Sequence, residues 1–481
     1  MADRGIYRVV EKPLLQGLGL ALFKLPFQNF NNNSRSKASG FGRSVTGLHE
    51  GCEQEAFAMY AGQFTAANET VVGTASFVFD RNTGSKPWQT EMHSLNWLHH
   101  FAASKRKLHS HFALRLLGRW AKARHPQDSF ETTCKVLLAL AIEGAELARG
   151  CDHNLQREFL KLASSQADLL RNWSTRSPTQ CIQKGATLLT AATAFQGLEN
   201  LRKPALELLE ANIDQVVMAD GGHLSGKPEK ILDVLALLLP LKLAMELDQQ
   251  IFPIRTSRAF DRMIAMVEHL RLGGGNLAFV DMSVKRTNLV EKIYAMRTGV
   301  RHTHMLAENS QIARLAKGKT CLIADTANRF NFEFSHGIQP LFRSATLGTE
   351  QQNNVANTSE CAAGLILELG QTSHTRTYFL SSNGLDLRVE DVHAEAIEIV
   401  FELQPNVKLT ALRESNDLLL VLPGREVWKL SLRGAEARIE QNGLILRLLS
   451  TGQGRINWAL KKQLKARNTA RRQEDLPDLL S

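Results

Sequence analysis

His223 is the residue whose type and neighbours most directly suggest chemistry. Two glycines precede it in the segment Ala-Asp-Gly-Gly-His-Leu-Ser-Gly-Lys-Pro at residues 219–228, and an apolar segment follows. Glycines allow a tight backbone turn, and a side chain on a turn before a helix reaches a groove more easily than one inside a helix. Because imidazole titrates near neutral pH, His223 can serve as an acid, a base or an anion partner. The alternative is a histidine that only bonds a neighbouring carbonyl group.

Tyr294 and a group of three histidines are further candidates for chemistry. Tyr294 is one of four tyrosines in the chain, and a phenol can transfer protons, although neighbouring Val290 favours a place in the core. His302 and His304, together with His336, are of the residue type that binds zinc. They lack a carboxylate or thiol at ligand spacing, so we expect neither a metal nor another cofactor.

The elements that must position these residues are helices up to about residue 272. Apolar residues recur with a helical period in eight successive segments, at residues 93–105, 108–123, 130–149, 157–173, 181–198, 203–217, 228–247 and 257–272. Pro228 suits a first helical turn, Gly150 suits a helix end, and the glycines at 273–275 end the last segment. Eight or more helices with short connections predict a bundle, a solenoid or an α/α toroid.

The last third of the chain has the period of antiparallel strands. Apolar and polar residues alternate at residues 397–404 and 428–432. Asn383-Gly384 and Asn442-Gly443 are typical of hairpin turns, and a small hairpin is also predicted within residues 55–80. We therefore expect a β-sandwich after the helices.

These patterns divide the chain into four predicted regions. They are a helix and loop at residues 1–50, a helical domain at 51–310, a sandwich at 311–460 and a charged tail at 461–481. A charged run such as the tail is more typical of a solvated helix face or chain end than of a specific binding arm.

The charge balance favours a polyanionic partner. The 481 residues include 58 Lys+Arg and 48 Asp+Glu, which gives a net charge of +10, and such a charge attracts polyanions. Nucleic acid, acidic polysaccharide and an anionic membrane surface all satisfy this condition. Because the sequence contains no helix-turn-helix, RNA-recognition or zinc-finger pattern, we expect no nucleic-acid partner.

Features that bear on the compartment point in different directions. Six widely spaced cysteines without a Cys-x-x-Cys pair predict free thiols, and no apolar run is long enough to form a transmembrane segment. Arg4, Arg8 and Lys12 precede the apolar residues 14–23 and imitate a secretory signal. The lack of a clear cleavage site favours an amphipathic first helix instead, so a cytoplasmic location stays open.

Four segments in a common order give the sequence a resemblance to a known family. The turn at residues 219–228 resembles the Asp-Gly-Gly-His turn of the heparinase II/III-like family, and residues 87–98 resemble the aromatic helix near the start of its toroid. Residues 272–279 and 377–391 are similar to later family segments. The resemblance covers roughly residues 55–460.

The resemblance implies both a fold and an activity. The fold is an α+β multidomain chain, with an N-terminal α/α toroid followed by a C-terminal antiparallel β-sandwich. The activity is polysaccharide lyase chemistry, in which a uronate carboxylate is neutralised, a base removes the C5 proton and an acid protonates the departing 4-oxygen. An acidic polysaccharide partner, a basic groove between the two domains and the bacterial cell envelope or periplasm are implied with it.

Aromatic and polar residues near the first helices are candidates for holding the sugar. Aromatic faces suit the apolar face of a pyranose ring, but the helical spacing of Trp97 with Leu98 favours a core position for that tryptophan. The candidates for substrate binding are Trp88, Asn96, Trp97, His99, His100 and Lys227.

The sequence departs from the family in its proton-transfer residues. The tyrosine that usually follows the Asp-Gly-Gly element is absent from residues 225–230, and histidines expected before residues 331–334 and within 355–359 are missing. His336 replaces one of them only if the strand register shifts. General acid–base catalysis contributes about 10²–10⁴-fold, so its loss leaves a protein that binds a polyanion but cleaves it poorly.

Two functions therefore follow as hypotheses. The first is a lyase that eliminates across a uronate glycosidic bond, with His223 as neutraliser or base and with Tyr294 and His336 as candidates for proton transfer. The second is a non-catalytic protein that binds acidic glycan or cell-envelope polymer. The sugar, the cleavage mode and the oligomeric state stay open at this point.

Overall fold

The computed structural model describes residues 7–9, 37–48, 50–75, 77–80, 83–123, 129–295, 304–327, 330–347, 355–370, 373–412 and 417–463. The predicted first helix at residues 14–23, His302 and most of the charged tail lie outside the described residues.

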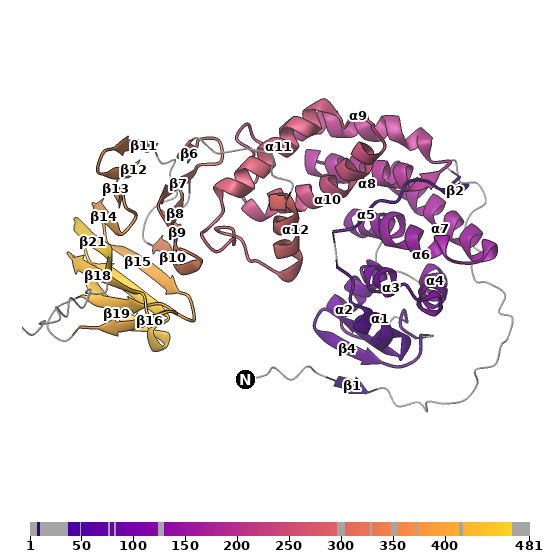
Figure 1. The fold of residues 1–481 in the computed structure, drawn as a ribbon, viewed down its shortest axis with the longest axis horizontal. Helices are drawn as coiled ribbons and strands as arrows, with labels where there is room; N and C mark the ends of the chain where they lie inside the picture. Colours follow the sequence, from indigo (N-terminus) through magenta and orange to yellow (C-terminus); the bar gives the residue numbers. More distant parts are fainter. Residues whose placement is uncertain are drawn as a thin grey trace, which may run out of the picture. The chain divides into compact units, whose positions relative to one another are not determined.

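The chain forms two compact units, and each is described by itself. The described residues of Met1–Val267 and Asp281–Val300 form a helical unit, and those of Glu268–Val280 and Arg301–Ser481 form a β unit. The helices and most of the strands are labelled in Figure 1. The predicted order, helices first and antiparallel strands second, is confirmed, whereas the predicted domain limits stay predictions.

The predicted helical segments lie on observed helices, with ends shifted by a few residues. The helices are α1 (Glu53–Tyr60), α2 (Lys86–His93), α3 (Leu98–Ser104), α4 (Lys107–Lys122), α5 (Phe130–Ala139), α6 (Ala145–Arg149), α7 (His153–Asn172), α8 (Pro178–Ala194), α9 (Arg202–Asn212), α10 (Pro228–Leu247), α11 (Ile254–His269) and α12 (Val284–Ala295). The segment predicted at 130–149 is interrupted by a π-helical turn, η1 (Leu140–Gly144). The sequence did not predict α12, whose short apolar face consists of Leu289, Val290 and Ile293.

Helix starts in this unit follow the local sequence closely. The side chains of Ser85, Ser129, Asp152 and Ser177 accept hydrogen bonds from backbone N–H groups in the first turns of α2, α5, α7 and α8. Such N-caps satisfy donors that the helix itself leaves unpaired. Pro228 occupies the first turn of α10, as predicted.

The hairpin predicted within residues 55–80 is present, but it is shorter than expected. It consists of β3 (Gln63–Ala66) and β4 (Glu69–Val72), and β1 (Tyr7–Val9) pairs parallel with β4. The residues after Val72 form turns, and residues 53–60 are helical. A second small pairing joins β2 (Gly40–Phe41) to β5 (Phe195–Gln196).

Two turns with the same pairing pattern follow α9 and α11. Val217 pairs with His223, and Arg271 pairs with Leu277, as isolated antiparallel bridges. In the first turn Gly221 has a φ of +93°, and a Cβ there would lie 1.9 Å from a carbonyl oxygen of α11. Only glycine tolerates both conditions. The two glycine-rich segments singled out in the sequence are therefore one structural motif used twice, with His223 in the place that Leu277 takes in the second turn.

Within the described residues, the β unit consists of two antiparallel sheets of eight strands each. The first contains, in spatial order, β19 (Glu436–Glu440), β20 (Ile445–Ser450), β15 (Ile397–Leu403), β10 (Gln339–Leu347), β9 (Phe332–His336), β8 (Thr320–Asp325), β7 (Ile312–Lys317) and β6 (Leu306–Ala307). The second contains β11 (Val355–Cys361), β12 (Gly364–Gly370), β13 (His374–Ser381), β14 (Asp386–His393), β21 (Gly454–Gln463), β18 (Val427–Arg433), β17 (Leu418–Val421) and β16 (Lys408–Ala411).

Aromatic side chains from both sheets form the centre of the sandwich core. Phe332 of the first sheet stacks on Trp458 of the second, with ring centroids 5.9 Å apart, and Phe334 contacts Trp428 edge-on at 5.6 Å. Burial of each phenylalanine contributes roughly 1.5–3 kcal/mol to folding. The alternating apolar residues of β15 and β18 point into this core, as their period of two predicts.

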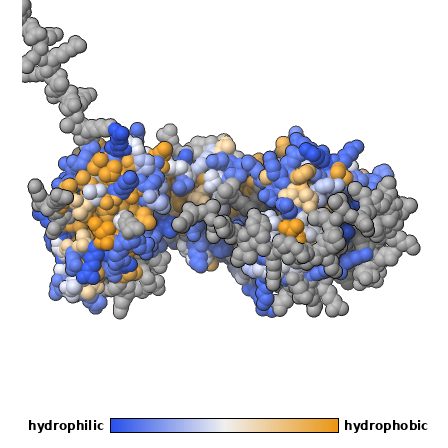
Figure 2. Space-filling view, turned by 90° about the horizontal axis from the view of Figure 1, so that it is seen from below, coloured by the Kyte–Doolittle hydropathy of each residue, from blue (hydrophilic) through white to orange (hydrophobic). Residues whose placement is uncertain are grey.

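The visible surface is mostly polar. Figure 2 shows apolar residues gathered on the β unit, at the left of the view. Exposed apolar side chains of this unit include those of Leu412, Ile439 and Leu444. Among the described helices, none combines the length and the apolar character that a bilayer crossing requires.

Candidate functional site

A cavity of about 510 Å³ lies in the helical unit, lined mainly by α5, α8 and α10. This volume is within the range of about 300–1,000 Å³ that is typical of ligand sites. A second hollow of about 550 Å³, beside α2, shares Asn96 and Lys135 with it. The two hollows therefore adjoin at these residues. The polar side chains of the cavity are Asn96, Glu131, Lys135, Glu143, Gln183, Thr190, Lys230 and Asp233.

Charges in the cavity are arranged unevenly. Lys230 donates a hydrogen bond of 2.9 Å to Asp233 one turn further along α10, and this bond raises the pKa of Lys230. Lys135 of α5 contributes a second positive charge to the lining. Burial raises the pKa of the Cys134 thiol to about 12, so that thiol stays protonated and is a poor nucleophile.

Glu143 contributes a carboxyl group to the cavity lining. It belongs to the π-helical turn η1, and burial raises its pKa to about 7, with a smaller contribution from the negative charge of Glu146. Within the described part of the chain it has no ion pair or hydrogen bond with another side chain. A carboxyl group that changes charge near neutral pH in a cavity is typical of a functional site.

His223 lies in the predicted turn before α10, but its ring is buried, with 9% exposure. Nδ1 accepts a hydrogen bond of 3.0 Å from the backbone N–H of Ser225, which leaves the proton on Nε2. Nε2 is buried and has no partner among the described residues. Burial, followed by the charge of Lys230, lowers the pKa of His223. The expectation of a ring that reaches an open groove is therefore wrong for this conformation, and the role of His223 in catalysis stays a prediction.

The two tryptophans predicted as sugar contacts are core residues. Trp88 is fully buried and its indole N–H donates to the carbonyl oxygen of Phe64, at 3.0 Å. Trp97 is buried too, and its indole N–H donates to the carbonyl oxygen of Met92, also at 3.0 Å. Neither ring presents a free face to a sugar, so the core alternative, which the spacing of Trp97 favoured, describes both.

The other predicted sugar contacts have different surroundings. Asn96 lines both hollows, and Lys227 is exposed at the N-terminal end of α10. His99 is buried and bonds the carbonyl oxygen of Asn96. Nδ1 of His100 accepts from the backbone N–H of Cys52 at 3.1 Å. Asn96 thus lines the cavity, and its contact with a sugar stays a prediction.

Tyr294 is on α12 and is half-buried beside Ile293. The cavity lining contains neither Tyr294 nor His223. The role of Tyr294 as a proton-transfer group stays a prediction.

His336, at the end of β9, is held in one protonation state by its neighbours. The Thr320 hydroxyl donates to the carbonyl oxygen of Gly384 at 2.5 Å, and it therefore accepts from Nδ1 of His336 at 2.8 Å. Lys462 donates to Nε2 at 2.8 Å and also to Glu426. Burial, followed by the Lys462 charge, lowers the pKa of His336. The imidazole accepts a further proton only if Lys462 moves away from it.

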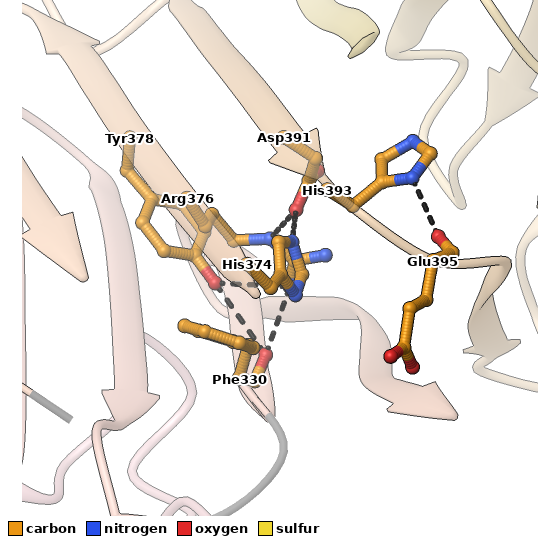
Figure 3. Close-up of polar contacts among 7 residues, drawn as sticks. All are labelled: Phe330, His374, Arg376, Tyr378, Asp391, His393 and Glu395. Carbon is orange, nitrogen blue, oxygen red and sulfur yellow. Dashed lines mark hydrogen bonds and ion pairs between the residues drawn. The ribbon is translucent and has the colours of Figure 1, made fainter. Parts of the chain in front are cut away.

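A second group of charged residues is buried inside the sandwich (Figure 3). His374 and Arg376 of β13 both donate to one carboxylate oxygen of Asp391 on β14, at 2.7 and 2.5 Å. Arg376 also donates to the carbonyl oxygen of Phe330 at 3.0 Å. Burial opposes ionisation of Asp391, but Arg376 and His374 outweigh it and lower its pKa. Burial raises the pKa of Tyr378, beside Arg376, to about 12.

This cluster joins neighbouring strands rather than offering groups to a ligand. Arg376 and Asp391 have no exposed surface. The cluster was not predicted from the sequence, although residues 377–391 carry part of the family resemblance. Its signal was present in the alternation of His374, Arg376 and Tyr378 at inward positions of β13, which places ionisable groups where apolar ones are expected.

Comparisons with known proteins relate the fold to polysaccharide lyases. The chain is similar to heparinase III, with a TM-score of 0.63 and 13% identity, over 89% of this chain and 87% of that one. It is also similar to a heparan sulfate lyase of Pedobacter heparinus, with a TM-score of 0.56 and 11% identity over 85% and 82% of the two chains. For a chondroitin AC lyase of Streptomyces coelicolor the values are 0.50 and 8%, over 86% and 79%. Identities this low show a shared fold alone.

A relative found by sequence has a different description. FtsZ-localized protein C of Caulobacter vibrioides is 28% identical over 211 residues, which are 42% of this chain and 35% of that protein. The match thus spans about a third of the relative. No family model matches the chain. The predicted α/α toroid and β-sandwich are confirmed, and the chain has the fold of the heparinase-type polysaccharide lyases.

Proposed function

We propose that this protein binds an acidic, uronate-containing glycan in the two adjoining hollows of the helical unit and cleaves it by β-elimination. The observation that carries the proposal is the pair of hollows, about 510 and 550 Å³, which share Asn96 and Lys135. An extended ligand in both hollows passes these two side chains. The amide of Asn96 and the ammonium group of Lys135, which line both hollows, are suited to binding a sugar carboxylate.

Elimination needs that carboxylate to be neutralised, because the C5 proton becomes acidic only when negative charge on the carboxylate is offset. Asn96 donates an amide N–H and Lys135 supplies a positive charge for this purpose. Lys230 is engaged with Asp233 and contributes less to it. The fold that the chain shares with heparinase III and the chondroitin lyase supports the proposed elimination by analogy.

The test is product formation by the full chain on a panel of acidic polysaccharides. Elimination creates an unsaturated uronate, whose ultraviolet absorbance reports turnover directly. We expect Lys135→Ala to weaken glycan binding by about 10–100-fold, because a hydrogen bond to a charged group contributes about 1.5–3 kcal/mol. Lys161→Ala is the matched control, since Lys161 lies on α7 and pairs with Glu158 at 3.0 Å, away from the lining residues. Equal binding by both variants would contradict the assignment of the site.

A second candidate function is a non-catalytic one in association with FtsZ. It is favoured by the 28% identity to FtsZ-localized protein C, which is higher than the identities to the lyases. The missing tyrosine after the Asp-Gly-Gly element fits it as well. Co-sedimentation of the full chain with FtsZ polymers, together with saturable glycan binding and no unsaturated product, would favour this candidate. A place in the bacterial cell envelope remains a proposal under either function.

A further inference from the structure

We propose that Glu143 is the proton-transfer residue of the cavity, taking the C5 proton of the glycan and returning it to the departing 4-oxygen. This inference rests on the proposed function. His223, Tyr294 and His336 do not belong to the lining of this cavity, and the sequence alone did not point to Glu143.

The backbone of η1 is what directs Glu143 into the cavity. A π-helical turn contains one residue more than the corresponding α-helical turn, and such turns frequently occur at functional sites. The turn separates α5 from α6 and places the Glu143 carboxyl group in the lining. Without the insertion, the residues after Leu140 would be rotated around the helix axis and would face a different direction.

The carboxyl group is packed against the backbone on one side. A Cβ on Gly47 would lie 2.8 Å from Oε1 of Glu143 and 3.1 Å from Cγ2 of Ile142. Glycine at position 47 thus allows the chain to pass directly beside the carboxyl group. This contact restricts the positions of Glu143 and removes water from one side of it.

Charged and titratable groups surround the cavity without neutralising Glu143. They are Glu131, Cys134 and Lys135 on α5, Glu146 on α6, and Lys230 and Asp233 on α10. Lys230 is bonded to Asp233, and Glu146 adds negative charge. Burial without a compensating cation explains a pKa of about 7 for Glu143. At neutral pH both the carboxylate and the carboxylic acid are then populated, as a group that accepts and donates a proton requires.

The reaction balances with this single group. The carboxylate takes the proton from C5, and the electron pair of that C–H bond forms the C4–C5 double bond. The bond between C4 and the 4-oxygen breaks, and the oxygen leaves with the electron pair of that bond. The carboxylic acid then donates its proton to the departing oxygen and returns to the carboxylate. No oxidant, metal or second acid takes part.

The decisive experiment compares Glu143→Gln, Glu143→Asp and wild type on a glycan that the wild type cleaves. We expect Glu143→Gln to lower kcat by about 10²–10⁴-fold, the usual contribution of acid–base catalysis, with unchanged glycan affinity. The wild-type rate should rise with pH through a limb near pH 7, which Glu143→Gln loses and Glu143→Asp keeps. Glu207→Gln, an exposed glutamate on α9, is the matched control.

The possible outcomes separate the two proposals. If Glu143→Gln turns over as fast as wild type, or loses affinity and not kcat, the role of Glu143 is overturned and the lyase function stands. If wild type forms no product on any acidic glycan, both proposals fall. Retained glycan binding by Glu143→Gln guards against misfolding, and the pH limb kept by Glu143→Asp distinguishes proton transfer from a structural role.

Discussion

Glu143 in the helical unit and Asp391 in the β unit are both carboxyl groups removed from water, yet their surroundings shift their pKa values in opposite directions. Asp391 receives hydrogen bonds from Arg376 and His374, which lower its pKa in spite of burial. Glu143 faces a cavity without a paired cation among the described residues, and burial raises its pKa to about 7. A buried carboxylate that is paired with cations stays ionised and has a structural role. A buried carboxyl group without a paired cation can exchange protons near neutral pH.

The largest effect is expected from Asp391→Asn. The amide keeps the shape of the side chain but leaves Arg376 as a buried charge without its counter-ion. Breaking a buried pair in this way costs about 3–5 kcal/mol. Denaturant unfolding followed by tryptophan fluorescence measures the loss, because Trp428 and Trp458 lie in the sandwich core.

Two further variants sharpen this prediction. Asp386→Asn removes the half-buried partner of the exposed Arg388 and should change stability by less than about 1 kcal/mol. The double variant Arg376→Met, Asp391→Leu removes both charges and should be more stable than Asp391→Asn. If the double variant is less stable than Asp391→Asn, the lost ion pair itself, rather than the unpaired charge of Arg376, accounts for the lost stability.

Lowering the pH should decrease the stability of the β unit through the cluster of His374, Arg376 and Asp391. The pKa of His374 is lowered, first by burial, and the pKa of Asp391 is lowered by its partners. For both groups the unfolded chain binds protons more readily, so stability is present above their unfolded pKa values and is lost as pH falls. We expect the loss to begin below about pH 6.5, where free histidine titrates. Unfolding midpoints at a series of pH values measure it, and a midpoint that rises toward acid would be the contrary result.

Glu143→Gln should affect stability in the opposite pH range. Because the folded pKa is raised from 4.5 to about 7, the folded protein binds the proton more readily, and this contribution is lost as pH rises through 7. We therefore expect the variant to exceed wild type by roughly 1–3 kcal/mol at pH 8.5 and to match it near pH 4, below the unfolded pKa of 4.5. Thermal unfolding at the two pH values tests this independently of any activity, with Glu207→Gln as control. An equal difference at both values would refute the raised pKa.

The smallest effect is expected for His336, whose surroundings are intermediate between those of Asp391 and those of Glu143. Lys462→Met removes the cation that donates to Nε2 and should raise the pKa of His336, because the Lys462 charge helps to lower it. Nuclear magnetic resonance of the imidazole measures the shift. Lys461→Met, on the adjacent and exposed position of β21, should leave it unchanged. An unaltered pKa in Lys462→Met would mean that the Lys462 charge does not contribute to the lowered pKa of His336.

The elements of the fold were predictable where the local signal is strong. The periodicity of residues 228–247 and the proline at its start define α10 within one turn, and the alternation at 397–403 defines β15. Prediction failed for α12, whose apolar face is short. It also failed for the π-helical turn at Leu140–Gly144, because one inserted residue leaves an apolar pattern nearly unchanged.

The candidate site was much less accessible from sequence. Asn96 was named and lines both hollows, but Trp88 and Trp97 are core residues and His223 is buried. Glu143 was missed because a lone glutamate in an amphipathic helix has no distinguishing pattern.

The order of helices and strands, the turn at Gly221 and the excess of positive charge were determined by the sequence alone, since periodicity, backbone freedom and composition are local properties. The tertiary structure decided which buried ionisable groups are paired with an opposite charge. Arg376 and Asp391 meet because β13 pairs with β14, whereas Glu143 faces a cavity formed by helices distant in sequence. A pKa depends on the solvent and charges within a few ångströms, and only the folded chain sets those distances.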